Sequence, residues 1–329
     1  MESRLSLHGS CGVVEEPATP SAAARVIAVT SGKGGVGKSN IALNLAIALR
    51  RMERSRIREN SARENSAREN SAVGCLDSRI LTNSATSVCA TSVCLIDANP
   101  GLSNIDLLCG LNGYWNLSHV VSGARGLSEI VLDGPEGIHV VSGAGGLSQL
   151  RDCPQEIRRD VLRQTTQLEE QHDYLVIDTG AGGQNSGRRL AAAADVALVV
   201  TTTEPTSIAD AYANVKALSA APPPNLMVVV NEVESGQQAA AIVDRMRRTA
   251  GLFLHTEIAH AGHIPHDRAV VHSVARRIPL LVDAPRSAAA EAVVQLARRV
   301  KTAADGSPPR SGFFSRIAER RRHDSVTPA

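Results

Sequence analysis

A glycine-rich segment between an apolar run and a helical run constrains the fold of this chain more than any other feature. Residues 32–39 are Gly-Lys-Gly-Gly-Val-Gly-Lys-Ser, which contains the pattern G-x-x-x-x-G-K-[ST]. The apolar residues 26–29 before it predict a buried strand, and residues 41–49 after it have helical spacing. This order is typical of a phosphate-binding loop, because glycines let backbone N–H groups approach phosphate oxygens closely.

The loop predicts a nucleotide site. We expect Lys38 to contact the terminal phosphates and the Ser39 hydroxyl to ligate Mg²⁺. The helix that begins near Lys38 directs the positive end of its dipole at the same place. A glycine-rich turn without a ligand is the alternative, and the flanking strand and helix disfavour it. The residues predicted to contact nucleotide here are Gly32, Lys33, Gly34, Gly35, Val36, Gly37, Lys38, Ser39 and Asn40.

Composition limits the classes of function that fit. The 329 residues include 35 basic and 33 acidic side chains, a formal net charge of +2, so overall charge does not indicate a polyanionic partner. The six cysteines form no C-x-x-C pair, which argues against a zinc or iron–sulfur site and is typical of reduced cytoplasmic thiols. We expect neither a signal peptide nor a membrane-spanning helix.

Apolar runs alternate with helical patterns along the rest of the chain. Strands are predicted at 93–97, 138–141, 174–178, 196–200 and 226–231. Helices are predicted at 107–111, 117–121, 157–171, 206–218, 238–249 and 288–300, with another ending at 190–194. The alternation predicts an α/β fold with a doubly wound, mainly parallel sheet and helices on both faces. Ligands bind such sheets at the carboxyl ends of the strands.

The chain divides into a domain and three irregular segments. We expect a flexible leader at 1–23, a nucleotide-binding domain at 24–304 and a basic tail at 305–329. Residues from about 52 to 90 repeat Arg-Glu-Asn-Ser-Ala and Ala-Thr-Ser-Val-Cys, and they predict a largely disordered insert. A partner-binding arm is the alternative. Because Val-Cys occurs at 88–89 and again at 93–94, the strand predicted at 93–97 has an alternative register that uses Val88.

Several sequence blocks, taken in order, resemble the MinD/ParA family of P-loop ATPases over about residues 24–304. They include K-G-G-V-G-K-S with its early lysine, Asp97-Ala98-Asn99, Asp178-Thr179-Gly180-Ala181-Gly182 and Ile264-Pro265-His266-Asp267. The stretch E-P-T-S-I-A-D-A-Y at 204–212 is most similar to the flagellar-number regulators of the FlhG (FleN) group within that family. The resemblance implies a P-loop NTPase fold and a homodimer that forms with ATP.

The resemblance also implies roles for individual residues. Lys33 would reach the partner subunit's nucleotide, with a solvated loop lysine as the alternative. Asp97 and Asp178 would hold Mg²⁺ together with Ser39, whereas ordinary strand-end carboxylates are the structural alternative. Three further residues would contact the adenine base, with a turn-forming Asn and a plain proline turn as alternatives. These are Asn231, Pro265 and Asp267.

Asn99 departs from the family's D-x-D pattern, in which the second acid orients the attacking water. An Asn side chain can hydrogen-bond a water molecule but cannot take its proton. We therefore expect ATP binding and dimerisation with slow hydrolysis, while neutral drift in a still-active enzyme is the alternative. The predicted catalytic residues are Lys33, Lys38, Asn99 and Asp178.

The tail carries two adjacent phenylalanines in an Arg-rich segment. Phe313, Phe314 and Ile317 can share one face of a short helix, near Arg316 and residues 320–322. This composition predicts an amphipathic anchor for an anionic membrane, with a disordered basic tail as the alternative.

The resemblance favours a regulator of flagellar number or placement that is cytoplasmic and reversibly peripheral on the inner membrane. The alternatives are a division-site ATPase, a DNA-partitioning ATPase and an ATP-binding scaffold with weak hydrolysis. Implied partners are a second copy of the chain, the anionic membrane, and a flagellar GTPase or switch/regulator protein. Nucleic acid binding is not expected, because Arg247-Arg248 and Arg276-Arg277 are scattered.

Overall fold

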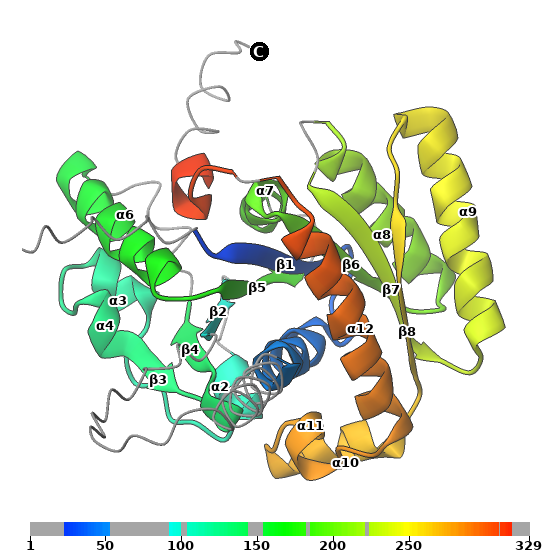
Figure 1. The fold of residues 1–329 in the computed structure, drawn as a ribbon, viewed down its shortest axis with the longest axis horizontal. Coiled ribbons are helices and arrows are strands. Elements are labelled where there is room, and N and C mark those ends of the chain that lie inside the picture. The colour runs from blue at the N-terminus through cyan, green and yellow to red at the C-terminus, as the bar shows by residue number, and fades with distance from the viewer. Residues whose placement is uncertain are drawn as a thin grey trace, which may run out of the picture.

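A single sheet with helices on both faces forms the centre of the computed structural model (Figure 1). The structure describes residues 23–52, 92–99, 104–143, 154–181, 185–220, 224–308 and 310–317. Nearly all of the predicted leader and nearly all of the predicted insert lie outside these residues.

The sheet has eight strands in the order β3-β4-β2-β5-β1-β6-β7-β8. Every neighbouring pair is parallel except β3 and β4. The strands are β1 (Arg25–Ser31), β2 (Val93–Asp97), β3 (Val131–Asp133), β4 (His139–Ser142), β5 (Tyr174–Ala181), β6 (Val196–Thr201), β7 (Asn225–Val233) and β8 (Ala259–Pro265). The predicted doubly wound, mainly parallel sheet is confirmed.

Helices connect the parallel strands. The helix after the glycine-rich loop spans residues 38–52, and a short helix spans residues 313–317. The others are α2 (Ile105–Leu108), α3 (Leu117–Val121), α4 (Leu127–Ile130), α6 (Gln155–Glu170), α7 (Asn185–Ala193), α8 (Pro205–Leu218), α9 (Gly236–Leu254), α10 (Arg268–Arg276), α11 (Leu280–Asp283) and α12 (Ala288–Asp305), with a 3₁₀ turn at Pro135–Gly137. Among the described residues, no helix combines the length and the apolar character needed to cross a membrane.

The sequence patterns missed the two edge strands, β3 and β8. β8 has the sequence Ala-His-Ala-Gly-His-Ile-Pro, in which Gly262 adopts a φ of +133° and apolar side chains are few. Its strand conformation comes from pairing with β7, so local propensity did not reveal it. At the repeat, β2 uses Val93 rather than Val88.

Alternating residues of the central strands build two apolar layers. Val26 and Ala28 of β1 belong to a cluster covered by α3, α6, α7, α8 and α9. Ile27 and Val29 face the other side, where the helix at 38–52, α11 and α12 cover them. All four side chains are fully buried, as expected for a parallel strand between two helical layers.

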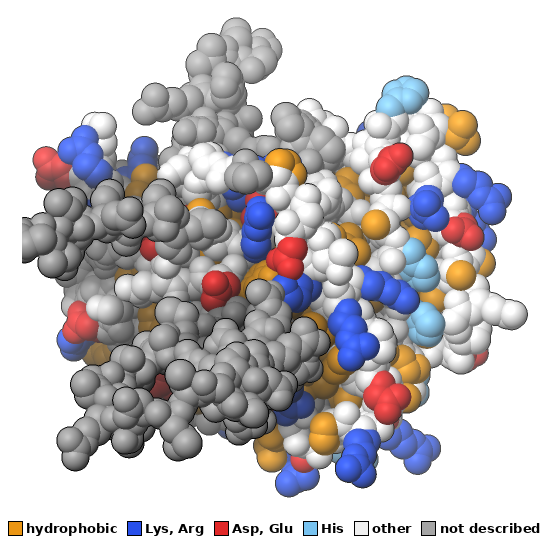
Figure 2. Space-filling model, viewed as in Figure 1, with side chains coloured by type: hydrophobic (Ala, Val, Ile, Leu, Met, Phe, Trp, Pro, Cys, Tyr) orange, Lys and Arg blue, Asp and Glu red, His pale blue; other side chains and the backbone are white. Residues whose placement is uncertain are grey.

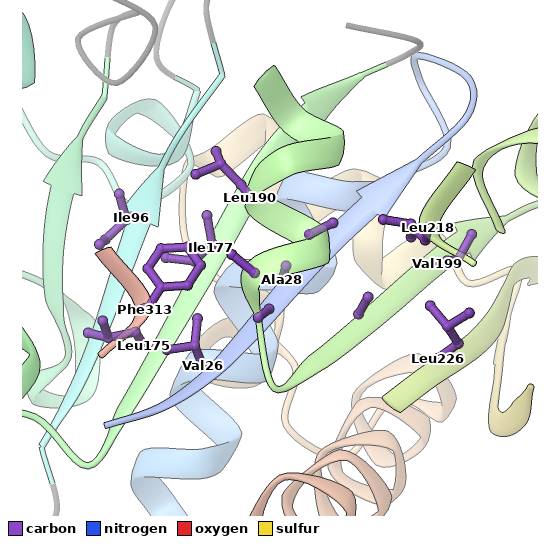
Figure 3. Packing of buried hydrophobic residues seen from close by; sticks show 14 of the residues in the cluster. Val26, Ala28, Ile96, Leu175, Ile177, Leu190, Val199, Leu218, Leu226 and Phe313 are labelled. Atoms are coloured by element: carbon purple, nitrogen blue, oxygen red, sulfur yellow. The ribbon is translucent and has the colours of Figure 1, made fainter. Parts of the chain in front are cut away.

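The short helix at 313–317 completes the first of these clusters. Phe313 is 1% exposed and Phe314 is 3% exposed. Figure 3 shows the Phe313 ring beside Leu175 and Ile177 of β5. Ile317 is partly buried against the same cluster. The prediction that these tail residues form an exposed membrane-binding face is therefore wrong for this structure, because their apolar area already packs against the sheet.

Polar contacts hold this helix in place. The two carboxylate oxygens of Glu169, at the end of α6, accept hydrogen bonds from the backbone N–H groups of Phe313 (3.0 Å) and Phe314 (2.8 Å). A guanidinium nitrogen of Arg316 lies 3.2 Å from a carboxylate oxygen of Asp195. Asp195 also accepts a hydrogen bond from the backbone N–H of Val26, which links the tail to the start of β1.

Candidate nucleotide site

The glycine-rich loop follows a path that requires glycine at several positions, of which Gly32 and Gly37 lie against neighbouring elements. It joins β1 to the helix at 38–52. A Cβ at Gly32 would lie 2.2 Å from the backbone carbonyl carbon of Asp210, because α8 packs directly on the loop. Gly37 has a φ of +87°, and a Cβ there would lie 2.5 Å from the amide nitrogen of Asn231. The loop is therefore shaped by α8 and β7 as well as by its own sequence.

Lys38, Asp97 and Asp178 meet below this loop. Asp97 ends β2 and is directly opposite Asp178 on β5 in the sheet register. All three side chains are buried. Burial lowers the pKa of Lys38, an effect that Asp178 and Asp97 oppose. Burial raises the pKa of Asp178, and the Asp97 carboxylate acts in the same direction.

The Asp178 carboxylate has no well-aligned hydrogen bond within the protein. Both of its oxygens are buried without one, although the Ser39 hydroxyl, the Gly180 backbone N–H and the Lys38 ammonium lie close enough to oppose the rise of its pKa. An uncompensated buried carboxylate is unfavourable, and a divalent cation offsets that cost. Carboxylate and hydroxyl oxygens are ligands that Mg²⁺ prefers. Asp178 together with Ser39 therefore fits the predicted Mg²⁺ site.

Asp97 has a different role in this structure. One carboxylate oxygen accepts from the backbone N–H of Asn99 (3.0 Å), and the other accepts from those of Asn104 (2.9 Å) and Ile105 (3.3 Å). Asp97 thus orders the backbone that carries Asn99 and caps the start of α2. Its predicted contact with Mg²⁺ stays a prediction.

Of the residues predicted near the base, Asn231 contacts the glycine-rich loop, whereas Pro265 and Asp267 belong to β8 and the start of α10. The Asn231 amide nitrogen donates to the carbonyl oxygen of Val36 in the loop (3.0 Å). Pro265 ends β8, and Asp267 is the N-cap of α10. The Asp267 oxygens accept from the backbone N–H groups of Ala269 (2.8 Å) and Ala289 (3.1 Å), which lowers its pKa. Asp267 therefore ties α10 to α12, a role that the sequence did not reveal, while contact with the base stays a prediction.

Lys33 lies at the surface and contacts α8. Its amino group is 2.5 Å from a carboxylate oxygen of Glu204 and 3.3 Å from the hydroxyl of Thr206. The side chains of Lys33 and Glu204 are 40% and 62% exposed. Both partners belong to the distinctive stretch 204–212, whose sequence pattern gives no sign that it faces the loop.

Comparison with known proteins agrees with this geometry. Residues 22–56 match the family model ParA, described as the NUBPL iron-transfer P-loop NTPase, and residues 142–300 match that of the cellulose biosynthesis protein BcsQ. The antiactivator FleN of Pseudomonas aeruginosa is 30% identical over 277 residues, which cover 84% of this chain and 86% of FleN. The chain belongs to the MinD/ParA family of P-loop ATPases.

Other members of the MinD/ParA family extend the match. The flagellum site-determining protein YlxH of Helicobacter pylori is 26% identical over 274 residues, covering 83% of this chain and 80% of YlxH. The cell division ATPase MinD of Pyrococcus furiosus superposes with a TM-score of 0.61 at 21% identity, covering 84% of this chain and 98% of that structure. MinD of Pyrococcus horikoshii, solved with Mg-ADP, superposes with a TM-score of 0.60 at 20% identity. The match covers 84% of this chain and 96% of that structure.

Proposed function

We propose that this chain is an ATP-dependent dimerisation switch that regulates flagellar number or placement. The convergence of Lys38, Asp97 and Asp178 on the glycine-rich loop carries the proposal, since the buried Asp178 carboxylate has no well-aligned hydrogen bond within the protein. The similarity to FleN and YlxH supports the flagellar assignment. The MinD relatives support the alternative of division-site placement, as in the protein from Bacillus subtilis.

The loop and Lys38 account for ATP binding. Backbone N–H groups of the loop surround the phosphates, and the Lys38 ammonium contacts their terminal oxygens. Asp178 and Ser39 would hold Mg²⁺, which when bound would neutralise charge on the phosphates. Burial of Lys38 and Asp178 strengthens these interactions, because charges attract more strongly away from water.

Asn99 accounts for slow hydrolysis. Its backbone is held by Asp97, so its side chain can orient a water molecule from a fixed position. The amide cannot accept the proton of that water, and phosphoryl transfer then depends on positioning and charge alone.

Lys33 couples hydrolysis to dimerisation. Its amino group is exposed and pairs with Glu204, and an exposed ion pair of this kind stabilises by only about 0–1 kcal/mol. The pair therefore breaks readily when a stronger anion approaches. The partner subunit's nucleotide supplies such an anion, and Lys33 then stabilises the charge of the transferring phosphoryl group.

Light scattering with ATP, with ADP and without nucleotide tests the switch. We expect dimers with ATP only. Lys33→Ala should retain binding of a fluorescent nucleotide but lose turnover, whereas Lys216→Ala, which removes an exposed lysine of α8, should change neither. Monomers in every state, or a Lys33→Ala protein with full turnover, would refute the proposal.

The proposed location is the cytoplasm, with reversible residence on the inner membrane. Phe313 and Phe314 are buried in this structure, so the proposal does not rest on their exposure. Counting flagella and measuring septum position in a strain that lacks the gene separates the flagellar role from the division-site role.

A further inference from the structure

Successive turns of α8 lie along the start of the glycine-rich loop. At the start of the helix, Glu204 and Thr206 contact the amino group of Lys33. One turn later, the backbone of Asp210 lies so close to Gly32 that a side chain at that glycine would collide with it. The helix and the loop therefore run side by side, and the position of α8 sets the surroundings of Gly32 and Lys33.

A buried hydrogen bond joins the next turn of α8 to β1. The Asn214 amide nitrogen donates to the hydroxyl oxygen of Thr30 at 3.1 Å, and both residues are 3% exposed. Thr30 pairs with Val199 of β6, and its neighbour Val29 lies opposite Asp178 of β5. The bond therefore attaches α8 to the central strand directly before the loop.

The surroundings of Asn214 are mainly apolar. Ala211 and Leu218 of α8 are buried in the same cluster as Val199 of β6, part of which Figure 3 draws. On the face that Figure 2 draws, by contrast, hydrophobic side chains form only small areas among charged and polar ones. The Asn214 amide thus lies in an interior layer made mainly of apolar side chains.

The amide of Asn214 is only partly satisfied. Within the described part of the chain, its Oδ1 atom is buried and lacks a hydrogen-bond partner. Such an atom is costly, because it loses its hydrogen bonds to water on folding and gains none in return. A leucine side chain would extend the apolar layer without this cost, so net stability does not account for an amide at this position.

The start of α8 has an attachment of its own. The Ser207 hydroxyl oxygen accepts from the backbone N–H of Thr202 (3.0 Å) and lies 3.0 Å from the hydroxyl oxygen of Thr201. These contacts hold the start of the helix at the end of β6. Without the bond between Asn214 and Thr30, α8 would thus remain on the sheet but could shift relative to β1.

We propose that Asn214 is a positioning residue for ATP turnover, which holds α8 at a fixed place on β1 so that Lys33 acts from a fixed place in the loop. The inference rests on the proposed function, in which Lys33 stabilises charge at the partner subunit's nucleotide. A hydrogen bond suits this task because it weakens steeply with misalignment, whereas apolar contacts tolerate small displacements. Turnover should depend on this bond more than nucleotide affinity does, since β1, the loop backbone and Lys38 keep their places.

Thr30→Val tests the bond, because it removes the hydroxyl and nearly preserves the shape of the side chain. We expect kcat for ATP to fall by about tenfold, since a misplacement of about 1 Å can cost up to about a hundredfold in rate. The affinity for a fluorescent nucleotide should stay near that of wild type. Thr30→Ser, which retains a hydroxyl, should keep turnover near that of wild type.

Thr165→Val is the matched control, because it makes the same change at another buried threonine. The Thr165 hydroxyl donates to the carbonyl oxygen of Val161 within α6, a helix that does not carry the loop. This variant should lose stability in urea titrations without a change in kcat.

Asn214→Leu/Thr30→Val separates positioning from stability. Each single change leaves a buried polar group without its partner and should lower the urea midpoint, whereas the double change replaces both partners by apolar groups and should recover stability. We expect the kcat of the double variant to stay low. The inference is overturned if kcat recovers together with stability, if Thr30→Val turns over like wild type, or if Thr30→Ser is as slow as Thr30→Val.

Wild type in the same preparations distinguishes failure of this inference from failure of the proposed function. Light scattering reports the ATP-dependent dimer, and phosphate release reports turnover. Wild type that neither dimerises with ATP nor hydrolyses it refutes both. Wild type that does both, beside a Thr30→Val protein of equal kcat, refutes the inference alone.

Discussion

Replacing Phe313 with Ala tests whether the tail helix is part of the folded core. The Phe313 ring is almost fully buried between the tail helix and β5. Truncating a buried Phe to Ala costs about 3–5 kcal/mol, from lost burial and from the cavity that remains. A domain has only about 5–15 kcal/mol of net stability. A loss near 4 kcal/mol raises the unfolding constant about a thousandfold, and we expect a large shift of the urea midpoint.

Phe253→Ala is the matched control, because it makes the same chemical change at an exposed position. We expect it to change the unfolding free energy by no more than about 0.5 kcal/mol. Urea titrations followed by circular dichroism compare both variants with wild type. Equal effects of the two variants, or an unchanged midpoint for Phe313→Ala, would show that the tail is not packed on the sheet in solution.

Three further changes, one of them with a control, test Asn99, the glycine-rich loop and the cap of α10. Asn99→Asp should raise ATP turnover, because a carboxylate can accept the proton of the attacking water. Gly32→Ala should abolish nucleotide binding, since its Cβ would collide with the backbone of Asp210, whereas Gly251→Ala, with open space around it, should stabilise α9 by about 0.5–1 kcal/mol. Asp267→Ala should cost about 1 kcal/mol near pH 6 in urea titrations, from the lost cap of α10. The pKa of Asp267 is held below its ordinary 3.8, so its contribution is present above that pH and disappears as the pH falls through the lowered value.

Each of these changes has an outcome that contradicts its reasoning. An unchanged rate in Asn99→Asp would show that this position does not limit turnover. Normal nucleotide affinity in Gly32→Ala would mean that α8 can move away from the loop. A stability difference for Asp267→Ala that is as large near pH 3 as near pH 6 would exclude the ionised cap as its source.

The phosphate loop was predictable because its chemistry is local. The glycines, Lys38 and Ser39 lie within eight residues, and their roles depend on backbone geometry that the sequence itself enforces. Asp97 and Asp178 were also predictable as site residues, because each ends an apolar run and parallel strands bring their carboxyl ends to one edge. The strand order and the edge strand β8 were not predictable, because they depend on pairing between distant segments.

The tail shows most clearly where a local pattern is ambiguous. Two phenylalanines among arginines can face a lipid surface or a protein core, since a bilayer and a protein interior both favour apolar side chains. The structure supplies what the pattern lacked, namely Glu169 on α6 to accept the backbone N–H groups of the tail and Asp195 to pair with Arg316. Leu252 and Phe253 show the opposite case. They are apolar but exposed at the end of α9, and nothing in the helical pattern of α9 predicted this exposure.

The sequence by itself indicated the family through resemblance and predicted the layered fold from alternating apolar and helical runs. The spacing of the glycines, Lys38 and Ser39 also predicted which residues contact the phosphates. The tertiary structure alone decided which apolar residues are covered, where Lys33 finds its carboxylate and which acids are occupied by backbone N–H groups. The covering of Phe313 and the pairing of Lys33 with Glu204 depend on segments more than a hundred residues apart, and no local pattern encodes which distant surface will meet a side chain.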